Sequence, residues 1–156
     1  MSMTDNARKT IWTAADAATA TGGTVNSDWE ASGVSIDTRT LEPGDLFAAI
    51  KGPNHDGHDH VSTALAKGAA AAMIESRLQG SVPTELLLTV KDTVQGLRDL
   101  AAASRARCQA KICAVTGSVG KTGTKEMLAA ALGVQGKVTS TAGNLNNHYG
   151  LPLSLA

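Results

Sequence analysis

The sequence predicts an α/β protein: a small N-terminal α/β domain over residues 1–109, then the incomplete beginning of a second α/β domain over residues 110–156. Three observations favour this class. Apolar runs of strand length alternate with segments of helical periodicity. A glycine-rich loop lies between an expected strand and an expected helix. Hydrophobic residues make up 42% and charged residues 18% of the chain, which is typical of a globular protein.

The first half of the chain contains two expected helices and two expected strands. Thr13 can cap an alanine-rich helix over residues 13–21. Alternating apolar and polar residues predict a strand over 33–37, and an apolar run predicts a buried strand over 46–50. A second helix is expected over 61–67.

The elements that follow complete the first domain and begin the second. Apolar runs predict strands over 69–74 and 86–90, and the spacing of apolar residues predicts a helix over 92–107. We place the domain boundary near residues 107–110. Beyond it we expect three more elements, a strand over 111–116, a helix over 125–132 and a strand over 137–141.

Charge and aromatic content argue against nucleic-acid binding. The chain has 14 basic and 14 acidic side chains and a formal net charge of zero, so it lacks the basic surface that nucleic acids attract. Two Trp, one Tyr and one Phe are too few for a base-stacking surface.

The cysteines and the N-terminus favour the cytoplasm. Cys108 and Cys113 do not form a CxxC pair, and we expect Cys113, within an apolar run, to be a buried free thiol. The first residues do not resemble a signal peptide, and no apolar run reaches 18 residues. We therefore expect a soluble protein that does not insert into a membrane.

The glycine-rich loop is the strongest motif for function. Its glycines allow backbone N–H groups to point at phosphate oxygens, and the helix that follows adds positive potential. Lys121 would contact the outer phosphates and the Thr122 hydroxyl would bind Mg²⁺. Val115 stands where the general pattern has its first Gly. The loop residues expected to bind the nucleotide are Gly117, Ser118, Val119, Gly120, Lys121 and Thr122.

Two polar clusters allow more than one interpretation. His55, His58 and His60 could ligate zinc, although a polar loop is the simpler interpretation and substrate contact is a third. Asp37 and Arg39 follow a predicted strand, where Arg39 could bind phosphate or carboxylate, or form a surface ion pair with Asp37.

A third cluster of amides follows the last predicted strand. Asn144 and Asn147 could contact a nucleotide base or a magnesium-bound water, and they equally suit a turn.

Together these segments resemble the Mur ligase family, the cytoplasmic ATP-dependent enzymes that build the stem peptide of peptidoglycan. In this family the phosphate loop characteristically lacks the first Gly of the general pattern. Three blocks carry the resemblance: residues 35–39 with 42–47, 51–52 and 56–58; residues 116–122 with 124–127; and residues 143–154. The third block favours the branch that adds D-alanyl-D-alanine.

The resemblance implies two binding sites. The first domain would bind the uridine nucleotide of a UDP-N-acetylmuramoyl-peptide, and the second would bind ATP and Mg²⁺ through the glycine-rich loop, Asn144 and Asn147. Lys121 would also be catalytic. The loop around the histidines would then face substrate, and we expect no bound zinc. The residues implied for the uridine nucleotide are Ser35, Asp37, Thr38, Arg39, Lys51, Gly52 and His58.

The implied reaction is amide ligation through an acyl phosphate. ATP would phosphorylate the terminal carboxylate of the UDP-linked tripeptide, and the amine of D-alanyl-D-alanine would displace the phosphate. The remaining catalytic groups would lie beyond residue 156, so we expect this chain to bind the UDP-linked substrate without catalysing. The unfinished sheet leads us to expect residues 137–156 to be mobile or to pair with another copy. We expect the full-length enzyme to be a monomer.

Other functions remain open from the residues alone. The diaminopimelate- or lysine-adding branch of the same family shares the first block. A small kinase or GTPase would share the phosphate loop, but the sequence has no NKxD-type guanine motif. A non-catalytic UDP-sugar-binding module is the non-enzymatic alternative.

Overall fold

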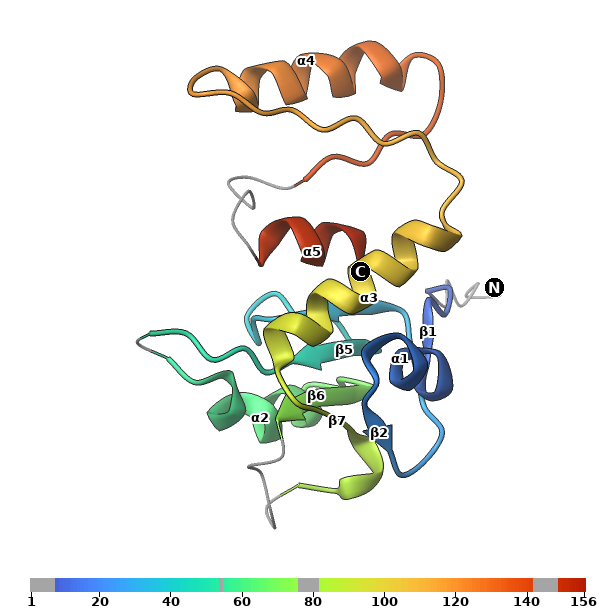
Figure 1. Ribbon diagram of the computed structural model, residues 1–156, viewed down its shortest axis with the longest axis vertical. Coiled ribbons are helices and arrows are strands. Elements are labelled where there is room, and N and C mark those ends of the chain that lie inside the picture. The colour runs from blue at the N-terminus through green and yellow to red at the C-terminus, as the bar shows by residue number, and fades with distance from the viewer. Residues whose placement is uncertain (1–7, 54, 76–81, 142–148) are drawn as a thin grey trace, which may run out of the picture.

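A five-stranded sheet in the order β2-β7-β6-β5-β4 forms the centre of the protein (Figure 1). The structure, a computed structural model, describes residues 8–53, 55–75, 82–141 and 149–156. Strands β4 to β7 are mutually parallel, and β2 pairs antiparallel with β7. The bounds are β2 (Thr24–Val25), β4 (Gly33–Ser35), β5 (Asp45–Ala48), β6 (Ala71–Glu75) and β7 (Leu87–Val90).

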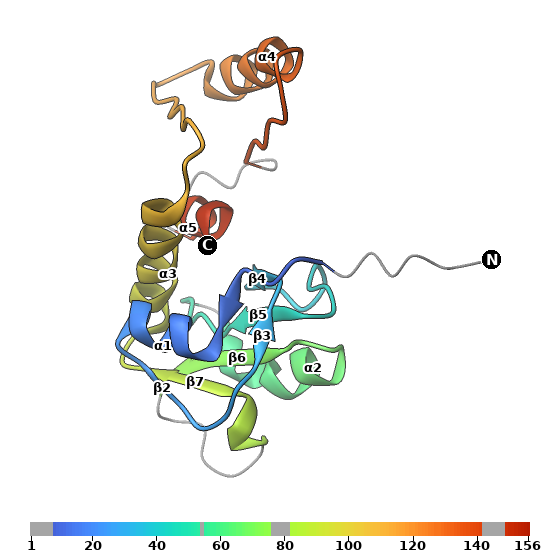
Figure 2. The same ribbon diagram turned by 90° about the vertical axis from the view of Figure 1, so that its right-hand side faces the viewer.

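Helices cover both faces of this sheet. Successive side chains of a strand point to opposite faces, so Leu46 packs into one apolar cluster with α1 (Ala14–Thr21) and α3 (Thr93–Arg107). Its neighbour Phe47 packs into a second cluster with α2 (Val61–Ala66). Figure 2 shows α1 and α3 on one side of the sheet and α2 on the other. The predicted α/β class is therefore confirmed.

Side-chain caps fix where two of these helices begin. Thr13 Oγ1 accepts the Asp16 N–H at the start of α1, and Asp92 Oδ1 accepts the Gln95 N–H at the start of α3. Gly22 ends α1 with a positive φ of 63°, a conformation that glycine adopts without strain. Both helices begin where the sequence predicts.

A short ribbon and a C-terminal helix, neither predicted from the sequence, pack into the same apolar cluster as α1 and α3. The ribbon pairs β1 (Trp12–Thr13) with β3 (Glu30–Ala31) in antiparallel register. Trp12 is 1% exposed, its Nε1 donates to the carbonyl of Ala156 over 2.7 Å, and α5 (Gly150–Leu155) packs on α3. In this structure α5 therefore packs within its own chain, and the expectation that residues 137–156 are mobile or pair with another copy stays a prediction.

The predictions of strands over residues 111–116 and 137–141 were wrong. Residues 111–116 and 137–141 have no strand structure. A strand needs a neighbouring strand for its backbone hydrogen bonds. Among the described residues, no strand follows β7, which ends at Val90, and so no later strand is available to pair with these segments. Cys108 and Cys113 are consequently exposed free thiols, so the expected burial of Cys113 was also wrong.

The helix predicted in the second domain is present and longer than expected. It is α4 (Lys121–Gly133), and it begins next to Gly120, whose φ of 79° lies in the left-handed region. None of its residues is buried, and Figure 1 shows it standing apart from the sheet.

None of the described helices combines the length and the apolar character needed to cross a membrane.

Candidate functional site

The residues predicted to bind the uridine nucleotide lie at the carboxyl edge of the parallel strands. Strands β4 and β5 are neighbours, with Val34 opposite Leu46 and Ser35 opposite Phe47. One group of predicted residues begins at Ser35, the last residue of β4, and the other follows β5. Ligands of open α/β sheets bind outside this edge, so the topology brings both groups to a plausible binding position.

The turn after β4 is held by its own polar groups. Ser35 is 5% exposed, and its hydroxyl donates to the Asp37 carbonyl over 3.1 Å. The Arg39 guanidinium donates through Nε and Nη2 to both carboxylate oxygens of Asp37, the shortest contact being 2.6 Å. The surface ion pair between Asp37 and Arg39 is thus present, and Ser35 shapes the turn.

This ion pair holds the Arg39 guanidinium, which we call the Arg39 fork, in one position at the surface. The Arg39 side chain is 86% exposed, while Asp37 is more enclosed at 32%. Hydrogen bonds from the Arg39 side chain, and then from its backbone N–H, lower the pKa of Asp37 from its ordinary value of 3.8 to about 2. Because Asp37 occupies only one side of the guanidinium, the other donors of Arg39 face solvent and suit phosphate.

We expect Asp37 to titrate near pH 2 in a carbon-detected NMR experiment on its carboxyl group. Its pKa is lower in the folded protein than in the unfolded chain, so the pair stabilises the fold above about pH 4 and loses that effect as the pH falls toward 2. In Arg39→Ala the titration should return toward 3.8. An unchanged midpoint in that variant would show that Arg39 is not the cause.

Lys67 joins this turn although the sequence analysis did not select it. It lies just after α2, and its Nζ donates to the Thr38 carbonyl over 2.6 Å. Lys67 and Lys51 are both exposed. A basic residue directly after the helix that follows β5 was the available signal, but sequence alone did not connect it to Thr38.

The loop after β5, which we name the Lys51 loop (residues 51–53 and 55–58), closes on itself. Lys51 and Asp56 form an isolated antiparallel bridge, and the Gly52 N–H donates to the His55 carbonyl over 2.8 Å. His58 is 9% exposed and lies in the 3-10 helix η1 (Gly57–His60). The last part of the polar loop considered for these histidines is therefore helical.

The histidines of this loop do not converge as a metal centre. In the part of the chain that the structure describes, no three His, Cys, Asp or Glu side chains are grouped to hold a metal ion. Both ring nitrogens of His58 already have protein partners, Asp56 and the Glu75 N–H.

The glycine-rich loop has part of the geometry that phosphate binding requires. Lys121 Nζ donates to the Gly117 carbonyl over 2.5 Å, so the ammonium lies across the loop at the N-terminus of α4. Gly117 and Gly120 have positive φ values of 154° and 79°, which suit glycine. Ser118, Val119 and Thr122 are exposed. The Lys121 ammonium and the backbone N–H groups of the loop are donors that fit nucleotide phosphates. The strand predicted before the loop is absent. Asn144 and Asn147 lie outside the described residues.

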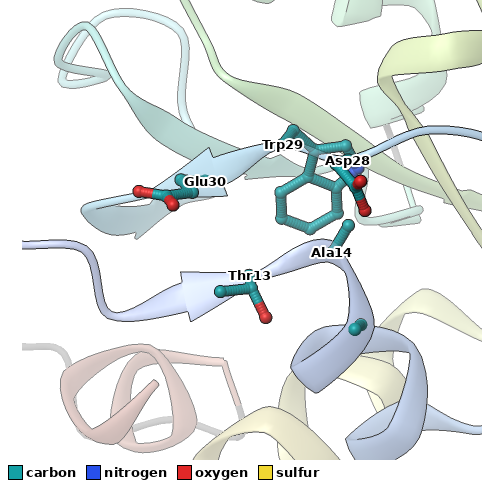
Figure 3. Close-up of a pocket in the computed structure, with 6 residues that line it drawn as sticks. Thr13, Ala14, Asp28, Trp29 and Glu30 are labelled. Atoms are coloured by element: carbon teal, nitrogen blue, oxygen red, sulfur yellow. The ribbon is translucent and has the colours of Figure 1, made fainter.

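A hollow of about 460 Å³ lies away from both predicted sites. It is lined by the start of α1 and by Asp28, Trp29 and Glu30. Figure 3 shows the Trp29 ring extending from the β3 side toward the junction of β1 and α1. The carboxylates of Asp28 and Glu30 would repel a phosphate, so this hollow does not suit a nucleotide.

Comparisons with known proteins decide the family. Residues 30–130 match the family model described as Mur ligase family, catalytic domain, and residues 115–156 match the Mur ligase middle domain. The chain belongs to the Mur ligase family. The family resemblance found in the sequence is therefore confirmed.

Three similar proteins place this Mur ligase chain more closely. It is 46% identical over 122 residues to the UDP-N-acetylmuramoyl-tripeptide–D-alanyl-D-alanine ligase of Escherichia coli K12, covering 78% of this chain and 26% of that ligase. It resembles a crystal structure of MurF from Acinetobacter baumannii with a TM-score of 0.77 and 37% identity, covering 92% of this chain and 32% of the other. It also resembles the crystal structure of MurF ligase from Thermotoga maritima in complex with ADP. The TM-score is 0.65 at 36% identity, and the match covers 79% of this chain and 28% of the other.

This Mur ligase chain thus spans about a quarter to a third of the length of the relatives that it matches. The middle-domain match begins at residue 115, after α3 ends at Arg107. The predicted boundary at 109/110 stays a prediction, because the two family matches overlap.

Proposed function

We propose that this chain binds the uridine nucleotide of UDP-N-acetylmuramoyl-tripeptide for a ligase that adds D-alanyl-D-alanine. The similarity to ligases of that name supports the substrate class. The observation that carries the proposal is the Arg39 fork, held by Asp37 at the carboxyl edge of β4. Lys51 and Lys67 add positive charge in the loops around this edge.

We give different roles to the predicted residues. Arg39 and Lys51 are exposed and can contact the diphosphate directly. Asp37 orients Arg39, and Ser35 fixes the turn between them. Anchoring this distant nucleotide would hold the reacting carboxylate in place, so that binding energy is used for positioning.

The glycine-rich loop is the proposed ATP site. ATP with Mg²⁺ would supply the phosphoryl group that activates the substrate carboxylate as an acyl phosphate, which the amine of D-alanyl-D-alanine then attacks. Lys121 would neutralise phosphate charge, and the Thr122 hydroxyl would hold the metal ion. The similarity to a MurF ligase in complex with ADP supports nucleotide binding here. Exposed free thiols at Cys108 and Cys113 suit the reducing cytoplasm.

One alternative has structural support. Because α4 buries none of its residues, the phosphate loop of this chain lacks the packing that would hold it rigid. The chain by itself would then act as a UDP-sugar-binding module, with weak ATP affinity and no release of phosphate. The diaminopimelate- or lysine-adding reaction remains the alternative within the family.

Calorimetric titration with UDP-N-acetylmuramoyl-tripeptide tests the proposal. We expect saturable binding by the unmodified chain and an affinity about tenfold lower in Arg39→Ala, because a charge-assisted contact to the diphosphate is removed. Arg98→Ala is the matched control, since Arg98 is an exposed arginine on α3. Equal affinities in the two variants would argue against a site at Arg39.

A further inference from the structure

The Lys51 loop is attached to the sheet at its base. The Gly57 N–H donates to the Ile50 carbonyl over 2.9 Å, which joins the two ends of the loop. A Cβ on Gly57 would lie 2.7 Å from the Ile50 nitrogen, so glycine permits this close approach. These contacts define the shape of the loop, but they do not connect it to the neighbouring strand β6.

His58 makes that connection. Its Nε2 accepts the backbone N–H of Glu75, the last residue of β6, over 3.0 Å. Its Nδ1 lies 2.6 Å from Asp56 Oδ1, and its own backbone N–H donates to the same oxygen over 3.0 Å. Because Nε2 accepts an N–H, the neutral ring carries its proton on Nδ1 and donates it to Asp56. The ring therefore bridges the loop and the end of β6.

We propose that His58 is a positioning residue for the uridine nucleotide rather than a substrate contact. This inference rests on the proposed function. The ring is almost buried and both of its nitrogens have protein partners, so neither is available to a ligand. Its bond to Glu75 holds the loop that carries Lys51 against the sheet edge. Apparent affinity falls when the binding-competent arrangement is populated less, so loss of this bond weakens binding without removing a ligand contact.

Two conservative variants separate the two bonds of the ring. In His58→Gln the side-chain oxygen can reach the position of Nε2 and accept the Glu75 N–H. In His58→Asn the amide can reach the position of Nδ1 and donate to Asp56, but nothing reaches Glu75. His60→Gln, which changes an exposed histidine on the same segment, is the control.

We expect the affinity for UDP-N-acetylmuramoyl-tripeptide, measured by calorimetry, to fall about tenfold in His58→Asn and less than about threefold in His58→Gln. His60→Gln should bind like the unmodified chain. Circular dichroism verifies that each variant is folded. Equal affinities of the Asn and Gln variants would overturn the proposal, as would an Asn variant that binds like the unmodified chain.

NMR supplies an independent measurement. The ring nitrogens of His58 should show the neutral form protonated at Nδ1, and hydrogen exchange of the Glu75 amide should be slow in the unmodified chain and His58→Gln but fast in His58→Asn. Direct nuclear Overhauser contacts between the His58 ring and bound substrate would overturn the positioning role. If the unmodified chain binds no substrate, the proposed function fails. Equal hydrogen exchange of the Glu75 amide in the two His58 variants would then also overturn the inference that His58 attaches the loop to β6.

Discussion

Substitution of Trp12 with alanine is expected to lower the free energy of unfolding by about 3–5 kcal/mol, the usual cost of removing a large buried aromatic side chain. Trp12 is 1% exposed and lies in the same apolar cluster as Leu97 and Leu100. The Arg107 guanidinium lies 3.9 Å from the centre of its ring. The indole also donates to the backbone oxygen of Ala156, so the substitution removes a contact with the residue that follows α5.

Equilibrium urea unfolding followed by circular dichroism measures this effect without relying on tryptophan fluorescence. Trp12→Phe keeps a ring beneath Arg107 and should lose about 1–2 kcal/mol. Ile11→Ala is the neighbouring control; Ile11 is 37% exposed, so its loss should stay below about 1 kcal/mol. If Trp12→Ala costs no more than Ile11→Ala, Trp12 does not hold the ribbon, α3 and α5 together.

In the proposed full-length ligase, substitution of Lys121 with alanine is expected to reduce the affinity for ATP and Mg²⁺ by about 10–100-fold, because a hydrogen bond to a charged group contributes about 1.5–3 kcal/mol. The affinity for UDP-N-acetylmuramoyl-tripeptide should remain nearly unchanged, since the residues proposed for it lie at the β4–β5 edge. In a ligation assay of the full-length enzyme, where we expect the loop to be held in place, loss of one such contact should lower the rate by about 10²–10³-fold.

Lys125→Ala is the matched control for Lys121. It removes the same charge one turn further along α4, where the Lys125 Nζ donates to the Thr141 carbonyl over 2.8 Å. Both variants lose one positive charge, so any general effect of charge on ATP affinity should be the same in both. Only Lys121→Ala should also lose a direct contact with phosphate. Equal loss of ATP affinity in the two variants would contradict the role given to Lys121.

Local sequence signals predicted the first domain well. The hydroxyl of Thr13 and the carboxylate of Asp92 cap the helices that they were expected to cap. Strands β5 and β6 are apolar on both faces, and helices cover both faces of the sheet. The ribbon of β1 and β3 was missed because two-residue strands are too short to show a period of two.

The second domain was predicted less well because strand formation is not local. Residues 111–116 have an apolar pattern, but a strand also requires a partner that supplies hydrogen bonds. In contrast, α4 forms without buried residues, since a helix satisfies its own backbone.

At the candidate site, the sequence selected residues that the fold brings to one edge of the sheet, but it could not show which protein groups they contact. The sequence predicted substrate contact for His58 and could not reveal that its Nε2 accepts the Glu75 N–H, which is the basis for the positioning role proposed above. It omitted Lys67 because the contact with Thr38 joins residues 29 positions apart.

Titration of the unmodified chain with UDP-N-acetylmuramoyl-tripeptide, and separately with ATP and Mg²⁺, tests the central claim most directly. We predict saturable binding of the UDP-linked tripeptide, weak binding of ATP, and no phosphate release when both are present with D-alanyl-D-alanine. Tight binding of ATP without binding of the UDP-linked tripeptide would contradict a uridine-nucleotide site at the carboxyl edge of β4 and β5.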